Sequence, residues 1–127
     1  GFNHRLDLAE MIMVKDNHID RAGSITAAVA TIRDRLSPCP PIEVECRNDP
    51  EVQEAVRSRV DRIMLDNMTQ EQIAGVLSFI PEWIETEISG GVNASNISEL
   101  GRLGADFISV GSLTNSARNI DLSMTLM

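Results

Sequence analysis

The chain is poor in basic and aromatic residues, and both shortages restrict the partners it can have. Its 11 lysines and arginines are outnumbered by 19 aspartates and glutamates, which gives a formal net charge of -8 over 127 residues. Non-specific binding to nucleic acid requires a surface of clustered basic side chains. Aromatic residues make up only 3% of the chain, with one tryptophan, so a platform for base stacking is also excluded. We therefore expect no nucleic-acid partner.

Cysteine, histidine and long apolar runs are scarce as well. Cys39 and Cys46 cannot form a zinc site by themselves, and only two histidines are present to complete one. No apolar run approaches the roughly 20 residues that cross a bilayer, and no signal-peptide pattern is found. Signatures of a catalytic triad, a reactive cysteine, a Walker loop and a Rossmann fingerprint are missing. We expect free, mostly buried thiols, no membrane partner and a cytoplasmic protein.

The chain does contain a regular alternation of strand and helix patterns. Short apolar or alternating stretches predict strands at residues 11–14, 42–46, 62–65, 83–88 and 106–110. Apolar residues at helical spacing predict helices at 24–36, 49–60 and 69–79, and a further helix from 96 to a stop at Gly104. The expected helix caps are Ser24, Asp49, Thr69 with Gln72, and Asn96 with Glu99.

Strands separated by helices at this interval predict repeated βα units on a parallel sheet. No linker or low-complexity tract divides the chain, so we expect residues 1–127 to form one domain. A complete (β/α) barrel needs about eight strands and some 250 residues. The predicted fold is therefore α/β, part of a TIM-like barrel whose early strands lie outside this sequence. A doubly wound open sheet is the alternative architecture.

Polar residues stand at the carboxyl ends of the predicted strands. Lys15, Glu45 and Asp66 end the first three strands, and the segments Ser89-Gly90-Gly91 and Val110-Gly111 end the last two. In parallel α/β folds these ends meet at one edge, where ligands bind. Period-two alternation puts the three charged residues opposite apolar neighbours, so they are expected to point into the mouth of the barrel.

Two interpretations of these residues are open. Carboxylates suit ribose hydroxyls or magnesium and a lysine suits phosphate, which favours a site for a phosphorylated, polyhydroxylated ligand with a divalent cation. The alternative is a buried ion network of Lys15, Glu45 and Asp66 that only fixes strand register. The strand-end glycines would let backbone N–H groups approach an anion, although such glycines can also be simple tight turns.

Two further segments carry weaker signals. Arg5 offers a bidentate fork for a carboxylate with His4 beside it, or else the pair belongs to a solvated loop. His18 is expected to stabilise a loop after Lys15 rather than to bind a ligand.

Six motifs in the same order resemble the carboxy-terminal barrel of the quinolinate phosphoribosyltransferase family. They are Asn3-His4-Arg5, Met13-Val14-Lys15-Asp16-Asn17-His18-Ile19, Val44-Glu45-Cys46, Met64-Leu65-Asp66-Asn67-Met68, Glu87-Ile88-Ser89-Gly90-Gly91 and Ile108-Ser109-Val110-Gly111. The resemblance covers essentially the whole chain. It implies an enzyme of de novo NAD biosynthesis that converts quinolinate and phosphoribosyl pyrophosphate to nicotinate mononucleotide, carbon dioxide and pyrophosphate, with Mg²⁺.

Motif position implies the residue roles that go with this resemblance. His4 and Arg5 would contact the quinolinate carboxylates, and Lys15 would face the substrates at the centre of the site. Glu45 and Asp66 would hold the ribose hydroxyls and magnesium, and together with Lys15 they would form the catalytic set. The 5′-phosphate would be held by a group of small residues, namely Ser89, Gly90, Gly91, Ser109 and Gly111.

The resemblance also implies parts that this sequence lacks. Members of the family carry an amino-terminal domain and an early barrel strand that supply further arginines and lysines, and two subunits build each site. We therefore expect a homodimer or larger homo-oligomer, and a fragment that is inactive alone. The competing functions are a related phosphoribosyltransferase with another acceptor, such as the molybdate-operon relative, and a non-catalytic assembly module.

Overall fold

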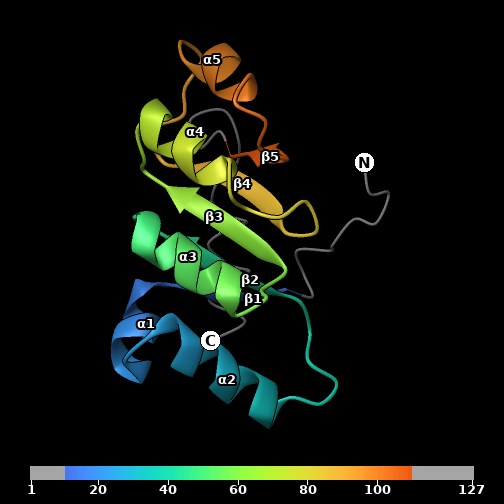
Figure 1. The fold of residues 1–127 in the computed structure, drawn as a ribbon. Coiled ribbons are helices and arrows are strands. Elements are labelled where there is room, and N and C mark those ends of the chain that lie inside the picture. The colour runs from blue at the N-terminus through green and yellow to red at the C-terminus, as the bar shows by residue number, and fades with distance from the viewer. Residues whose placement is uncertain (1–10, 110–127) are drawn as a thin grey trace.

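The computed structural model describes residues 11–109, which form one five-stranded sheet and five helices (Figure 1). The strands are β1 (Ile12–Val14), β2 (Ile42–Cys46), β3 (Arg62–Asp66), β4 (Glu85–Ser89) and β5 (Phe107–Ile108). The helices are α1 (Asp16–Ala22), α2 (Ile25–Arg35), α3 (Asp49–Arg57), α4 (Gln70–Leu77) and α5 (Ile97–Gly101). None of these helices has the length and hydropathy of a membrane span.

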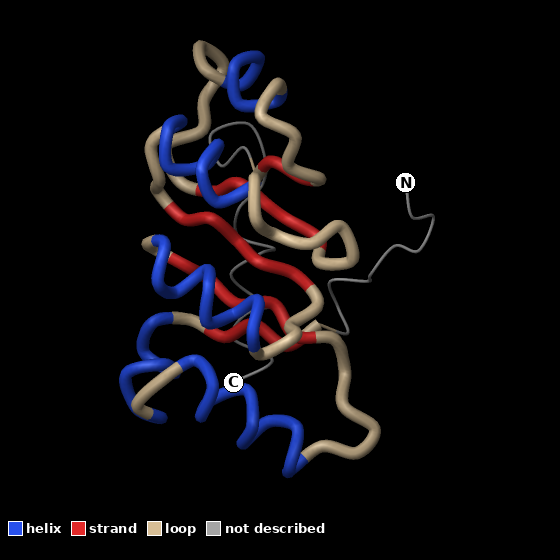
Figure 2. The backbone as a smooth tube through the Cα atoms, viewed as in Figure 1, coloured by secondary structure: helices blue, strands red, loops and turns tan. Residues whose placement is uncertain are grey.

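The order of the strands decides between the two predicted architectures. Every neighbouring pair is parallel, and the sheet runs β1-β2-β3-β4-β5 in sequence order. A doubly wound sheet reverses its strand order at a switch point, and this sheet has no reversal. Because crossovers are right-handed, sequential order keeps the connecting helices on one face, as Figure 2 shows. The prediction of part of a TIM-like barrel is confirmed, and the doubly wound alternative is wrong.

The helices pack against one face of the sheet, which we call the outer face. Along the strands the alternate side chains that point toward the helices are mostly apolar and buried. The fully buried apolar residues of this outer face are Val14, Ile42, Val44, Cys46, Ile63, Leu65 and Ile88. The helices contribute Ile25, Val29, Val52, Ala55, Ile73, Val76 and Leu100 to the same core. Burying a side chain of this size stabilises the fold by about 1.5–3 kcal/mol relative to exposure.

Two of the four predicted helix caps are confirmed. The Ser24 hydroxyl accepts a hydrogen bond from the Ala27 N–H at 3.0 Å, and α2 begins at the next residue. Thr69 and Gln72 form a reciprocal capping box at the start of α4. Both pairs have the cap-to-third-residue spacing that makes such signals readable in a sequence.

Of the other two predicted caps, one lies a residue away from its predicted position and one lacks the capping hydrogen bond. The cap of α3 is Asn48, whose carboxamide oxygen accepts from the Glu51 N–H at 3.0 Å, so Asp49 is already inside the helix. Both residues are good caps, and Pro50 is tolerated in either of the first two helical positions. Asn96 does occupy the N-cap position of α5, but its side chain makes no capping hydrogen bond because it is bonded elsewhere.

The segment after Lys15 also differs from its prediction as a loop. Helix α1 begins at Asp16 and ends at Ala22, and its C-cap Gly23 adopts the left-handed conformation with φ of 101°. The helix has only seven residues and Ile19 is its one buried side chain, so no helical periodicity is visible in the sequence. His18 does stabilise this segment, because its Nδ1 accepts a hydrogen bond from the Lys15 N–H at 3.1 Å.

Candidate functional site

The face of the sheet opposite the helices is polar, and we call it the inner face. It carries Lys15, Glu43, Glu45, Arg62, Met64, Asp66, Glu85, Glu87, Ser89, Phe107 and Ser109. The strand register arranges them in rows: Glu43 pairs with Arg62, which pairs with Glu85. The next row joins Glu45, Met64 and Glu87, and the row nearest the carboxyl ends joins Asp66 to Ser89. This last edge, with Lys15, Glu45, Asp66 and Ser89, is called the rim below.

The charged groups at the rim influence one another. Burial raises the pKa of the Glu45 carboxyl above its usual range, the charge of Asp66 raises it further, and the Lys15 ammonium lowers it. Burial also raises the pKa of Asp66, as does the charge of Asp16, whereas Arg47 and Lys15 lower it. The structure therefore brings three predicted site residues together at the ends of three successive strands. Their carboxylates repel each other, and a bound cation would relieve that repulsion.

The predicted alternative, an ion network that only fixes register, is not formed within residues 11–109. No ion pair within 4.0 Å joins Lys15 to Glu45 or to Asp66. No hydrogen bond of the described residues involves the side chain of Glu45 or Asp66. Charges that are partly buried and left without direct partners are costly to a fold, so their presence at the rim favours a ligand over a structural role.

The rim has a donor set that suits magnesium bound together with a substrate. Among the described residues no group of three or more histidine, cysteine, aspartate or glutamate side chains is arranged to hold a metal ion. Glu45 and Asp66 are two carboxylates on adjacent strands. Mg²⁺ is commonly held by one or two carboxylates, by water and by substrate phosphates, rather than by a cage of protein ligands. The two carboxylates are therefore a donor set that fits a magnesium ion whose remaining ligands are oxygens from outside the chain.

The Gly90-Gly91 segment, which we call the glycine turn, lies directly against the end of β3. Both glycines have positive φ, 80° and 73°. A Cβ atom on Gly90 would lie 2.9 Å from the Asn67 nitrogen and 3.0 Å from the Asp66 Oδ1. No larger residue fits there, because both the conformation and the close approach require glycine. Neither glycine N–H has an acceptor among residues 11–109, so both remain available to an anion.

Arg47 is a basic residue beside the rim that was not among the predicted site residues. Arg47 follows β2 directly and pairs with Glu51 at 2.7 Å and with Asp16 at 3.4 Å. Its charge lowers the pKa of both Glu45 and Asp66, although it is not the largest influence on either. The sequence does contain a signal for Arg47. It lies two residues after Glu45, at a strand end where polar site residues are expected.

A second cluster that was missed lies deeper on the inner face. Arg62, only 4% exposed, donates from Nε and Nη2 to the Glu85 Oε1 at 3.1 and 2.8 Å, and its Nη1 lies 3.7 Å from the Glu87 Oε1. The guanidinium also stacks 4.4 Å from the centroid of the Phe107 ring. This arrangement satisfies the buried charge, which indicates a structural role.

Glu43 belongs to the same deep cluster and is 1% exposed. Neither of its carboxyl oxygens accepts a hydrogen bond from the described residues. Burial is the largest cause that raises the pKa of Glu43, to about 9, and the neighbouring Glu87 carboxyl raises it further. Glu43 is therefore a neutral acid at neutral pH. Glu43 lies two residues before Glu45 on β2, so the alternation of the strand already predicts that both side chains share one face.

Of the remaining predicted site residues, Ser109 contacts the deep cluster and the others lie outside the described residues. The Ser109 N–H donates to the Ile88 carbonyl at 2.9 Å, and the Ser109 hydroxyl donates to Glu87 in a short hydrogen bond, so this side chain is engaged with the deep cluster. His4, Arg5 and Gly111 lie outside the described residues.

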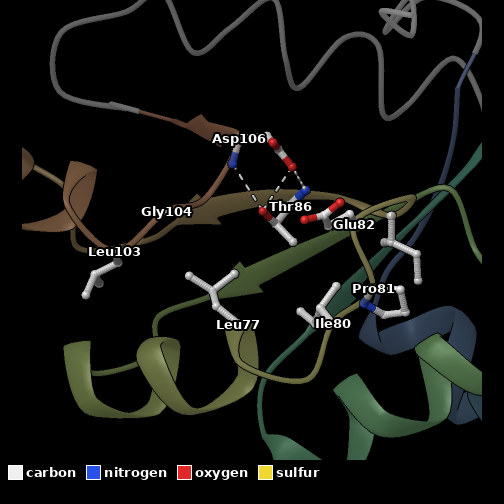
Figure 3. A pocket seen from close by; sticks show the side chains of 9 residues that line it. Leu77, Ile80, Pro81, Glu82, Thr86, Leu103, Gly104 and Asp106 are labelled. Carbon is white, nitrogen blue, oxygen red and sulfur yellow. Dashed lines mark hydrogen bonds between the residues drawn. The ribbon is translucent and has the colours of Figure 1, made fainter. Parts of the chain in front are cut away.

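A hollow of about 380 Å³ opens at the opposite end of the strands, on the helix side (Figure 3). Leu77, Ile80 and Leu103 line its apolar part. Asp106 accepts from the Thr86 N–H at 2.9 Å and the Thr86 hydroxyl accepts from the Asp106 N–H at 3.1 Å, which ties β4 to the start of β5. With no basic side chain in its lining, this hollow does not suit a phosphorylated ligand.

Comparison with known proteins identifies relatives along the whole chain. A family model described as "Quinolinate phosphoribosyl transferase, C-terminal domain" matches residues 1–125. A probable nicotinate-nucleotide pyrophosphorylase (carboxylating) from Synechocystis sp. is 44% identical over 130 residues. That alignment covers 100% of this chain and 44% of the relative, so the chain spans less than half of the relative's length.

Solved structures agree in fold. Nicotinate-nucleotide pyrophosphorylase from Ehrlichia chaffeensis superposes with a TM-score of 0.79 at 37% identity, over 87% of this chain and 40% of the other. The NadC protein of Streptococcus pyogenes superposes with a TM-score of 0.78 at 40% identity, over 91% of this chain and 41% of the other.

Proposed function

The chain belongs to the family of quinolinate phosphoribosyl transferase C-terminal domains, and on that premise we propose that it forms the catalytic barrel of an enzyme that makes nicotinate mononucleotide. The proposed substrates are quinolinate and phosphoribosyl pyrophosphate, and the other products are carbon dioxide and pyrophosphate. The observation that carries the proposal is the arrangement of the rim. Lys15, Glu45 and Asp66 lie close together there without forming an ion pair among themselves. Beside them, the N–H groups of Gly90 and Gly91 have no acceptor among residues 11–109.

Each half of the rim has a proposed task. Glu45 and Asp66 would bind the ribose hydroxyls and a magnesium ion, whose positive charge would attract the diphosphate. Lys15 faces the substrate oxygens as a cation, and the glycine turn with Ser89 receives the 5′-phosphate. Ser109 holds the strand end beside them through Glu87. His4 and Arg5 are proposed to bind the quinolinate carboxylates, and Gly111 to contribute to the phosphate pocket.

The reaction needs electrostatic stabilisation and positioning more than proton transfer. Departure of pyrophosphate leaves positive charge on the ribose, and the nearby carboxylates of Glu45 and Asp66 stabilise that charge. The quinolinate ring nitrogen attacks through its own lone pair, so no general base is required. Decarboxylation then uses the ring nitrogen as the electron sink, and the protein needs only to hold the geometry.

The proposal extends to the parts of the enzyme outside this chain. Because the chain spans 44% of its Synechocystis relative, we propose that an amino-terminal portion completes the quinolinate site. We further propose a homodimer or larger homo-oligomer and a cytoplasmic location. Both stay predictions here.

An assay for nicotinate mononucleotide tests the function directly. Quinolinate, phosphoribosyl pyrophosphate and Mg²⁺ are incubated with the chain alone and with a supplied amino-terminal portion of the Synechocystis relative. We expect product only when both parts are present, and its loss on Lys15→Ala. Thermal stabilisation of the assembled protein by nicotinate but not by quinolinate would contradict the proposed acceptor.

A further inference from the structure

The glycine turn is held by hydrogen bonds to two carbonyl groups, one directly before the turn and one within it. The first is the carbonyl of Ser89, which accepts from the Asn67 N–H at 2.8 Å. This bond extends the parallel ladder of β3 and β4 by one residue, and Asn67 adopts the left-handed conformation, with φ of 57°, which is uncommon for a residue other than glycine. Its backbone then lies close enough to Gly90 to exclude any side chain there.

The second held carbonyl is that of Gly91, which accepts from the Asn96 Nδ2 at 2.8 Å. The orientation of the Asn96 carboxamide is fixed, because its Oδ1 accepts from the Asn93 N–H at 2.9 Å. The Asn93 side chain in turn accepts from the Asn96 N–H and from Ser95. Asn96 is therefore bound to its own loop through its oxygen and to the glycine turn through its nitrogen.

Because each peptide unit is planar, these two hydrogen bonds also fix the directions of two backbone N–H groups. In a trans peptide the C=O and the following N–H point in opposite directions. Holding the Ser89 carbonyl therefore fixes the Gly90 N–H, and holding the Gly91 carbonyl fixes the Val92 N–H. Neither of these N–H groups donates to another group within residues 11–109, and both are turned away from the asparagine that holds the neighbouring carbonyl.

We propose that Asn67 and Asn96 are positioning residues that aim the Gly90 and Val92 N–H groups at the phosphate of the sugar substrate. Val92 thereby joins the binding residues through its backbone. This inference rests on the proposed function, since it requires that the rim binds a phosphate monoester. It gives Asn96 a role other than the helix cap that its place in the sequence predicts.

Ribose 5-phosphate titrated into the ¹⁵N-labelled chain tests the inference, with backbone amide shifts as the readout. In the wild type the Gly90 and Val92 amides respond together. In Asn96→Ala the affinity falls roughly three- to tenfold, the effect of one lost hydrogen bond. The Val92 response is lost while the Gly90 response persists, because Asn67 still holds Ser89. General damage to the loop would remove both responses instead.

Further variants control for folding and for the backbone. Asn96→Ser keeps a hydroxyl for the Asn93 N–H but is too short to reach Gly91, so it should behave as Asn96→Ala. Asn67→Gly retains the backbone N–H and the left-handed conformation, so the Gly90 response should remain. Ser98→Ala, exposed on α5, should bind as the wild type does.

The possible failures can be told apart. Wild-type binding of ribose 5-phosphate with unchanged affinity and an unchanged Val92 response in Asn96→Ala would overturn the positioning role and leave the proposed function intact. Absence of binding by the wild type would overturn the phosphate site itself and this inference with it.

Discussion

The two faces of the same sheet differ in how completely their side chains are satisfied. On the outer face, Val44, Ile63 and Leu65 are fully buried against helices, and nothing on that face requires a further partner. On the inner face, Glu45 and Asp66 stand near each other with raised pKa values and no direct countercharge among the described residues. The first arrangement is explained by stability, and the second is explained only by something that binds.

The inner face itself contains a similar contrast. In the deep cluster, Arg62 is held by Glu85, Glu87 and the Phe107 ring. At the rim, one or two rows away, Lys15 has no ion-pair partner within 4.0 Å in the described part of the chain. Buried polar groups that are satisfied specify a fold, whereas partly buried groups left unsatisfied mark candidate sites.

The largest effect on stability is expected from the outer face. Leu65→Ala removes a fully buried side chain and should lower the free energy of unfolding by about 2–5 kcal/mol. Met64→Ala, on the same strand but facing inward and partly buried, should cost less. Urea denaturation of the two variants measures the difference. Equal losses would contradict the assignment of the core to the outer face.

A substitution at the rim should reduce activity strongly without lowering stability. Glu45→Gln removes a charge next to the developing positive ribose and should reduce product formation by the assembled enzyme about 10²–10³-fold. Its free energy of unfolding should stay equal or rise at neutral pH, because the burial and repulsion that raise the pKa of Glu45 disappear. Glu71→Gln, exposed on α4, is the matched control and should change neither quantity.

The pH dependence of stability separates the deep cluster from the rim. The pKa of Glu43 rises from 4.5 in the unfolded chain to about 9 in the fold. Between these values the fold holds a proton that the unfolded chain has lost, so stability falls as pH rises from about 4.5 to 9. Glu43→Gln stays neutral in both the folded and the unfolded chain, so its stability should fall less over this range. Denaturation curves that shift in parallel with the wild type would contradict a neutral Glu43; the exposed Glu82→Gln should show such parallel curves.

The smallest effect is expected on the outside of the helical layer, away from both faces of the sheet. Gly75 lies exposed inside α4, and a Cβ atom there would meet nothing within 4 Å. Gly75→Ala should raise the free energy of unfolding by about 0.5–1 kcal/mol, because alanine loses less backbone entropy in a helix. A thermal denaturation midpoint that falls would show an unrecognised contact at this position.

Much of this comparison could be predicted from the sequence, because it depends on local periodicity. Alternation within each strand separates Glu45 from Val44 and Asp66 from Leu65, and that alternation is confirmed. Parallel strands end at a common edge, so the convergence at the rim also followed from the pattern. The boundaries were less accurate: β4 begins at Glu85, and Trp83, predicted to open that strand, is 52% exposed.

The features that were missed depend on register or on competition between similar residues. Arg62 meets Glu85 and Glu87 only because β3 and β4 pair with one particular offset, which no local pattern specifies. Asn48 and Asp49 are adjacent residues with nearly equal capping ability, so the sequence could not rank them. Asn96 matches a capping box, but its carboxamide instead bonds to Gly91, a contact that exists only after β4 and α5 are placed.

Mapping where phosphoribosyl pyrophosphate binds tests the contrast between the two faces most directly. The ¹⁵N-labelled chain is titrated with the ligand and Mg²⁺, and backbone amide shifts are followed. The account predicts that the largest changes fall on Lys15, Asp66 and the glycine turn, and that they weaken strongly in a Glu45→Gln, Asp66→Asn double variant. Changes centred on the hollow beside Leu77 and Leu103, or changes that persist in the double variant, would contradict it.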